Sequence, residues 1–150
     1  MMSASSAEPQ RKVVLVTGAS SGIGRAVATH LASCGHRVFG TSRHPAAEAS
    51  DGIEWVAMDV DDDASVERGV ASLLERAGRL DAVLNNAGWA LMGPIEETSI
   101  EEARAQMETN FFGVLRVCRA VLPVLRRQGG GHILISPLPQ PRRFGRRVAW

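Results

Sequence analysis

A glycine-rich turn between a strand-like run and a helical pattern most constrains the fold of this chain. Residues 13–16 (Val-Val-Leu-Val) are apolar at every position, which is typical of a strand buried on both faces of a sheet. The turn that follows reads Thr-Gly-Ala-Ser-Ser-Gly-Ile-Gly over residues 17–24. Glycine lets backbone N–H groups approach an anion, and the N-terminus of the next helix carries partial positive charge. The segment therefore predicts a strand–turn–helix unit that binds phosphate.

Strand and helix patterns alternate along the rest of the chain. Strands are expected at residues 13–17, 37–41, 53–58, 81–85 and 132–135, and helices at residues 23–35, 61–78 and 99–127. In the last helix we expect an apolar stripe of Phe111, Leu115, Cys118, Val121 and Leu122 to face the core, and residues 89–97 to form a loop. This alternation predicts an α/β fold with a doubly wound parallel sheet of about five strands and helices on both faces.

The two ends of the chain differ from its middle in composition. Residues 1–11 are mostly small and polar and are expected to form a disordered lead-in to a domain at 12–136. Residues 137–150 hold three of the seven prolines and four arginines without helical or strand periodicity, which predicts an unstructured tail. All 16 acidic residues precede residue 109, but the net charge is only +1, and no aromatic interleaving supports a nucleic-acid partner.

Cysteine usage and hydropathy favour a cytoplasmic protein. Cys34 and Cys118 lie far apart in helical patterns, so we expect small core residues of a reducing compartment rather than a disulfide. His30, His36 and His132 have no partners at metal-ligand spacing, which predicts no metal site. No apolar run approaches the ~18 residues of a membrane span, so no membrane partner is expected.

Four motifs together resemble the short-chain dehydrogenase/reductase family. The glycines at 18, 22 and 24 have its G-x-x-x-G-x-G spacing, and Asn-Asn-Ala-Gly at 85–88 ends the fourth expected strand. Asp59-Val60 ends the third strand, and Asn110 lies in Met-Glu-Thr-Asn-Phe-Phe-Gly at 107–113. The resemblance covers residues 13–136 and implies a Rossmann-like domain that binds a nicotinamide dinucleotide. It also implies hydride transfer with a small carbonyl or alcohol substrate, and it allows a homo-oligomer.

The resemblance carries a set of site residues onto this chain. The cofactor-binding set it implies is Gly18, Ser20, Ser21, Gly22, Ile23, Gly24, Ser42, Arg43, Asp59, Val60, Asn86, Ala87 and Gly88. Asn110 matches the catalytic asparagine, and Ser136 stands near the catalytic serine, although the family strand usually ends in a serine pair and Pro137 follows here. Purely structural alternatives stay open for each motif: a tight turn, a strand-closing turn, a helix-entry acid, a solvated arginine or an exposed helical asparagine.

The residues after the second expected strand favour NADP over NAD. An acidic residue there would hydrogen-bond the 2′-hydroxyl of the NAD ribose and repel a 2′-phosphate. This strand instead leads into Ser42 and Arg43, and the next acid is Glu48. A guanidinium and a hydroxyl are donors suited to a phosphate, so we expect NADP to be preferred.

The chemical half of the family's site is missing from this sequence. The resemblance implies a tyrosine as general acid/base with a lysine four residues later, yet these 150 residues hold no tyrosine, and their one lysine is Lys12. The chain is therefore expected to be an oxidoreductase by resemblance that is catalytically incomplete. The alternatives are a non-catalytic nucleotide-binding module and a truncated fragment whose strand at 133–135 is an exposed apolar edge.

Overall fold

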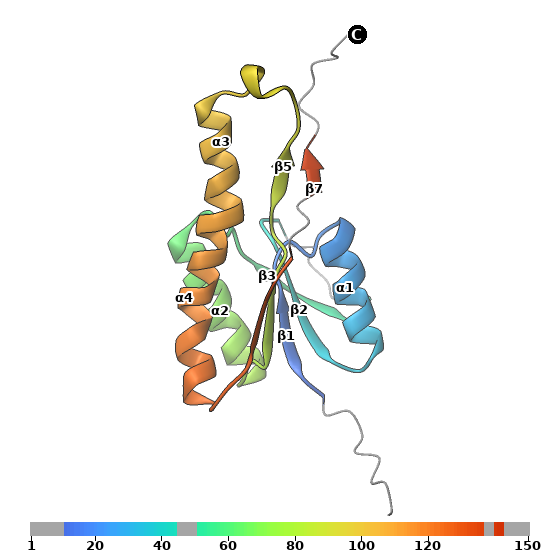
Figure 1. The fold of residues 1–150 in the computed structure, drawn as a ribbon. Helices are drawn as coiled ribbons and strands as arrows, with labels where there is room; N and C mark the ends of the chain where they lie inside the picture. Colours follow the sequence, from blue (N-terminus) through green and yellow to red (C-terminus); the bar gives the residue numbers. More distant parts are fainter. Residues whose placement is uncertain (1–10, 45–50, 137–139, 143–150) are drawn as a thin grey trace, which may run out of the picture.

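The computed structural model describes residues 11–44, 51–136 and 140–142, and its centre is a five-stranded parallel sheet (Figure 1). The strands are β1 (Val13–Val16), β2 (Arg37–Ser42), β3 (Ile53–Ala57), β4 (Ala82–Asn85) and β6 (His132–Ile135). Their order is β3-β2-β1-β4-β6, so the direction of winding reverses between β1 and β4. A reversal of this kind leaves a crevice at the carboxyl ends of the two central strands.

Helices cover both faces of the sheet, as the alternating pattern predicts. Helix α1 (Gly22–Ser33) lies on one face, and α2 (Asp63–Ala77) and α4 (Val114–Arg127) lie on the other (Figure 1). Two apolar clusters match these layers: one gathers around Val16, Ala28 and Val38 on the α1 side, and the larger gathers around Leu15, Leu73 and Val121 on the α2 and α4 side. The expected α/β doubly wound fold is confirmed.

The helix ends follow the local signals in the sequence. The Asp62 side chain caps α2 by accepting from the Ser65 N–H, and Gly78 ends the same helix in the left-handed conformation at φ +71°. Ser99 and Glu102 form a capping box at the start of α3 (Ile100–Met107).

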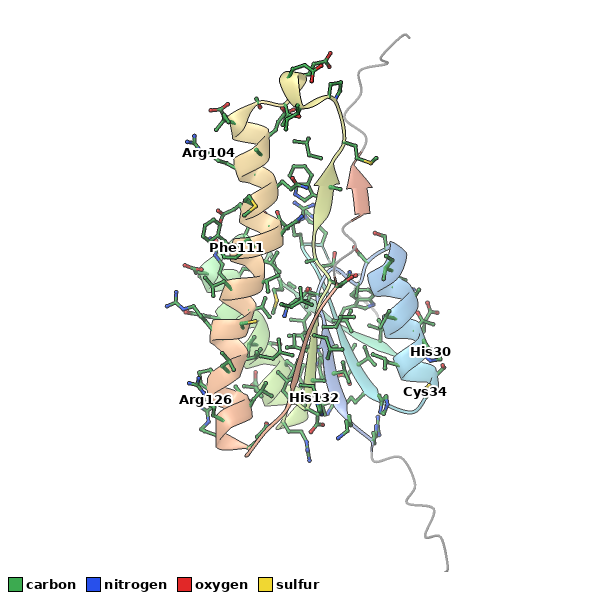
Figure 2. All side chains as sticks on the ribbon, viewed as in Figure 1. His30, Cys34, Arg104, Phe111, Arg126 and His132 are labelled. Atoms are coloured by element: carbon green, nitrogen blue, oxygen red, sulfur yellow. The ribbon has the colours of Figure 1, made fainter. Side chains whose placement is uncertain are left out.

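The long helix expected at 99–127 is present from Ile100 to Arg127, but a π-helical turn that was not expected lies within it. Residues Glu108–Gly113 (η2) form this turn between α3 and α4. A π turn takes in an extra residue and shifts the helix face, so the expected apolar stripe is only partly correct. Val121 is buried with Val117, Val124 and Leu125, whereas Phe111 and Leu115 are exposed; Figure 2 shows Phe111 on the side of the helix away from the sheet.

A second, small parallel sheet corrects two other expectations. Trp89–Leu91 forms β5, not the start of a loop, and pairs with β7 (Gln140–Arg142), three residues expected to be unstructured (Figure 1). A 3₁₀ turn (η1) follows at Ile95–Glu97. The expectations for residues 1–10, for the remainder of the tail and for residues 45–50 with Glu48 lie outside the described residues. Sequence periodicity cannot detect strands this short, since three residues contain no repeat.

The expectation that both cysteines are core residues is wrong. Cys34 is exposed at the end of α1 beside His30 (Figure 2), and Cys118 is half-buried on α4. Both are free thiols. Burial raises the pKa of the Cys118 thiol, against a lowering contribution from the Asn85 amide.

Candidate cofactor-binding site

A cavity of about 480 Å³ opens at the carboxyl ends of the central strands. Its size is that of a pocket for a small organic ligand. Its lining is drawn from the ends of four strands and from η2: Gly18, Ser20, Ser21, Thr41, Ser42, Arg43, His44, Met58, Asp59, Val60, Asp61, Asn86, Ala87, Gly88, Trp89 and Thr109. The strand reversal thus coincides with the cavity.

The glycine turn forms one wall and brings backbone close to backbone. Gly18 and Gly22 have φ of +64° and +56°, values that favour glycine. A Cβ on Gly18 would lie 2.8 Å from Ala87 Cα, so only a hydrogen fits there. Ser21 caps α1 without a side-chain hydrogen bond, and no acidic residue lies in the first turn of that helix. The N-terminal end of α1 is therefore suited to an anion.

Threonine and asparagine side chains join this turn to the end of β4. The Thr17 hydroxyl accepts from the backbone N–H groups of Asn86 (2.9 Å) and Ala87 (3.0 Å). In return, the Asn86 side-chain amide donates to the carbonyls of Thr17 (3.2 Å) and Gly18 (3.3 Å). Both polar side chains are buried. These bonds make the Asn-Asn-Ala-Gly segment a support for the glycine turn.

Thr41 fixes the opposite side of the turn. Its hydroxyl accepts from the Gly18 N–H at 3.3 Å, and its carbonyl accepts from the Ala19 N–H at 3.0 Å. The cavity wall then continues through Ser42, which is half-buried, to Arg43, which is exposed. The Ser42 hydroxyl accepts from the His44 N–H at 3.2 Å. Arg43 is thus a cationic group at the rim of the cavity, beside the end of β2.

Acidic residues after β3 form another part of the wall. Asp59 Oδ1 accepts from the Asp61 N–H at 3.1 Å, and the Asp59 N–H donates to the Ser65 hydroxyl at 2.9 Å. The Asp61 carboxylate accepts from the Thr109 hydroxyl at 2.9 Å. Burial raises the pKa of Asp61, and the nearby Asp59 and Glu108 charges add to the shift, against lowering contributions from Thr109 and Arg116.

The two expected catalytic positions lie outside the lining of this cavity. The Asn110 amide holds both backbone groups of Trp89: it accepts from the N–H at 3.0 Å and donates to the carbonyl at 2.8 Å. Ser136 follows β6, where its N–H donates to the Asn85 carbonyl at 2.9 Å.

Three positions of the expected cofactor set also do not line the cavity. Gly24 is buried, and a Cβ there would lie 2.4 Å from the Gly18 carbonyl oxygen. It therefore serves close packing of α1 on the turn. Gly22 and Ile23 begin α1 behind the turn, and Ile23 is 39% exposed. The other ten expected residues all line the cavity.

The expected cofactor-binding set omits several residues that line the cavity. Thr41 and Met58 sit at strand ends, where a βα fold gathers its ligand contacts. Position within the strand could have indicated them. Trp89 and Thr109 are brought together by the π turn, which leaves no signal in the spacing of apolar residues.

A reversal in a parallel sheet, a glycine turn at a helix N-terminus and a polar cavity at their junction define a dinucleotide-binding α/β protein. Comparison with known proteins agrees: the family model described as short chain dehydrogenase matches residues 12–136. The chain belongs to the short-chain dehydrogenase family.

Relatives and solved structures are similar to this chain over most of its length. A 3-ketodihydrosphingosine reductase from Bacteroides thetaiotaomicron is 42% identical over 125 residues, covering 83% of this chain and 46% of that protein. A short-chain dehydrogenase structure from Streptomyces avermitilis has a TM-score of 0.76 at 39% identity, covering 84% of this chain and 48% of that one.

Two other solved structures contain bound cofactors. ElxO with NADP bound has a TM-score of 0.76 at 27% identity, covering 86% of this chain and 59% of that one. A 3-ketoacyl-(acyl-carrier-protein) reductase from Brucella melitensis with NADH has a TM-score of 0.73 at 31% identity, covering 79% and 52%. The chain spans about half the length of the curated relatives it matches.

Among the helices that the structure describes, none has the length and apolar character needed to cross a membrane. No three histidine, cysteine, aspartate or glutamate side chains gather as metal ligands within the described residues.

Proposed function

We propose that this chain is the cofactor-binding half of an NADP-dependent oxidoreductase. The observation that most supports this proposal is the glycine turn at Gly18 and Ser20–Gly22, which we call the backbone cradle. It lies beside the cavity and ends at the N-terminus of α1, which has no side-chain cap. The cradle suits the pyrophosphate of a dinucleotide, because free N–H groups and a helix dipole favour an anion. When bound, a nicotinamide cofactor supplies or accepts a hydride.

In this proposal, different residues of the chain contact different parts of the cofactor. Asp59 and Val60 face the adenine, Ser42 and Arg43 face the 2′-phosphate, and Asn86–Gly88 border the nicotinamide side. Asn110 acts on that side through the backbone of Trp89, which it holds by two hydrogen bonds. The role of Ser136 as the carbonyl-polarising serine stays a prediction.

The proposed reaction is hydride transfer with a small carbonyl or alcohol substrate, in the cytoplasm. These 150 residues supply no tyrosine, and Lys12 precedes β1. A chain made of these residues is therefore proposed to bind the cofactor without turnover. The same observation favours a second candidate, a non-catalytic dinucleotide-binding module. A truncated fragment that binds nothing is the third alternative.

Titration of the purified chain with NADPH and NADH, followed by tryptophan fluorescence, tests this proposal. We expect saturable binding of both and tighter binding of NADPH. Arg43→Ala should raise the Kd for NADPH roughly tenfold or more, because a charge-assisted bond to phosphate is lost, and leave the Kd for NADH nearly unchanged.

Arg68→Ala is the matched control, since Arg68 is an exposed arginine on α2 that does not line the cavity. If Arg43→Ala weakened the binding of NADPH and NADH by the same factor, a contact between Arg43 and the 2′-phosphate would be excluded. Absence of binding together with a broad thermal transition would favour the fragment, and turnover of a carbonyl substrate would refute catalytic incompleteness.

A further inference from the structure

Thr109 connects two walls of the cavity that are far apart in the sequence. Its hydroxyl donates to Asp61 Oδ2 at 2.9 Å and accepts from the Trp89 indole N–H at 3.2 Å. The three side chains come from η2, from the loop between β3 and α2, and from β5. All three residues line the cavity. The hydrogen bonds therefore join residues of the cavity wall to one another.

The two partners of Thr109 differ in their burial. Trp89 is 6% exposed. Its backbone is hydrogen-bonded to the Asn110 side chain and to the Gln106 amide, which donates to the Trp89 carbonyl at 3.2 Å. Asp61 is an exposed loop residue. Within its loop, the Asp59 N–H donates to the Ser65 hydroxyl at 2.9 Å and the Asp61 N–H donates to Asp59 Oδ1 at 3.1 Å. Arg116 of α4 also donates to Asp63 Oδ1 at 2.6 Å and to the Val60 carbonyl at 3.4 Å. Thr109 thus connects the exposed side chain of Asp61 to a buried indole.

The π turn brings about this double attachment. Thr109 contacts the Trp89 indole while its neighbour Asn110 contacts the Trp89 backbone. Gly113 allows the same turn to approach the Asp61 loop closely, since a Cβ there would lie 2.9 Å from Val60 Cγ2. Single π turns inside α-helices often occur at functional sites.

We propose that Thr109 is a positioning residue that clamps the 59–61 wall against Trp89 and so sets the width of the cofactor cavity. This inference rests on the proposed function, because it takes the cavity to hold a dinucleotide. A threonine hydroxyl can donate to a carboxylate while accepting from an indole N–H. Valine has nearly the same shape but can do neither, so Thr109→Val releases the wall without opening a large void.

Hydrogen exchange and NADPH titration of the Thr109→Val and Thr109→Ser chains test the clamp. In Thr109→Val, the backbone amides of residues 59–61 should exchange roughly tenfold faster, and the Kd for NADPH should rise roughly tenfold, as expected for one lost bond to a charged group. Thr109→Ser keeps the hydroxyl and should restore both. Thr98→Val is the matched control, because the Thr98 hydroxyl bonds the Pro94 carbonyl away from the cavity.

Asp61→Ala removes the acceptor of the same hydrogen bond. This variant tests the clamp even if the Thr109→Val chain fails to fold. It should speed exchange by the same factor, and the double variant should add little more, because both changes remove one interaction. Unchanged exchange and NADPH affinity in Thr109→Val, or an equal change in Thr98→Val, would overturn the clamp alone. A wild-type chain that binds no NADPH would overturn the proposed function and the clamp together.

Discussion

At the scale of single residues, a few buried polar side chains hold the cradle in place. Thr17 is 1% exposed, and its one hydroxyl serves two backbone N–H groups at the end of β4. The Asn86 side-chain amide donates two hydrogen bonds to carbonyls of the glycine turn. Because a buried donor without a partner costs more than a formed bond gains, the cradle depends on these few atoms.

Replacing Thr17 by valine should lower the free energy of unfolding by about 2–6 kcal/mol. The change keeps the volume but leaves the N–H groups of Asn86 and Ala87 without their acceptor, at ~1–3 kcal/mol each. Urea denaturation measures the loss. Thr17→Ser retains the hydroxyl and should recover most of the stability. A Thr17→Val chain as stable as wild type would refute this account of the cradle.

At the scale of elements, a carboxylate connects the starts of two neighbouring strands. Asp81 precedes β4, and its side chain accepts from the Val13 N–H of β1 at 2.7 Å and from Arg79 Nε at 3.1 Å. Burial alone would raise the pKa of this carboxyl, but the Val13 and Arg79 donors outweigh it and lower the pKa. The bond anchors the β1–β4 pairing, on which the cavity depends.

Asp81→Asn should therefore remove a pH-dependent part of the stability. Because the pKa of Asp81 is lowered in the folded chain, its contribution is fully present above the unfolded value of about 3.9 and is lost as the pH falls through the lower folded value. We expect the free energy of unfolding of wild type to exceed that of Asp81→Asn by about 1–2 kcal/mol at neutral pH. This difference should shrink below about pH 4.

Urea denaturation across that pH range measures the effect of Asp81→Asn. Glu75→Gln, an exposed change on α2, is the control and should leave the pH profile close to that of wild type. A stability difference between Asp81→Asn and wild type that stayed constant down to acidic pH would contradict the lowered pKa.

At the scale of the whole molecule, the two edges of the sheet differ. On β3, Glu54 pairs with Arg37 and Arg76, so that edge is charged. On β6, Leu134 is 50% and Ile135 is 60% exposed, and no described strand pairs with its outer side. An apolar edge with unpaired backbone favours association with other chains.

Ile135→Lys should reduce association of this chain with itself. A lysine on the open edge adds charge and removes exposed apolar surface. Concentration-dependent light scattering should fall relative to wild type. Ile95→Lys is the control, since Ile95 is 87% exposed in η1, away from the sheet edge, and should have little effect. Equal scattering by wild type and Ile135→Lys would mean that the edge does not drive association.

Local signals predicted most elements and most of the cavity lining. The β-branched runs, the capping residues and the glycine turn each act within a few residues, so the five sheet strands, the cap at Asp62 and the capping box at Ser99 were predictable. Positions at strand ends carry the expected site because parallel strands bring their carboxyl ends to one edge. For that reason Arg43, Asp59 and Asn86 line one cavity although the sequence separates them.

The sequence by itself determined the fold class and the glycine turn that precedes α1, since both depend on short-range backbone geometry and on the period of apolar residues. Only the tertiary structure decided the π turn, the β5–β7 pair and the Thr109 bridge, since each depends on contacts between distant segments. The exposure of Phe111 and Cys34 belongs to this second group. Helical spacing tells which residues share a face, but packing against the sheet decides which face is buried.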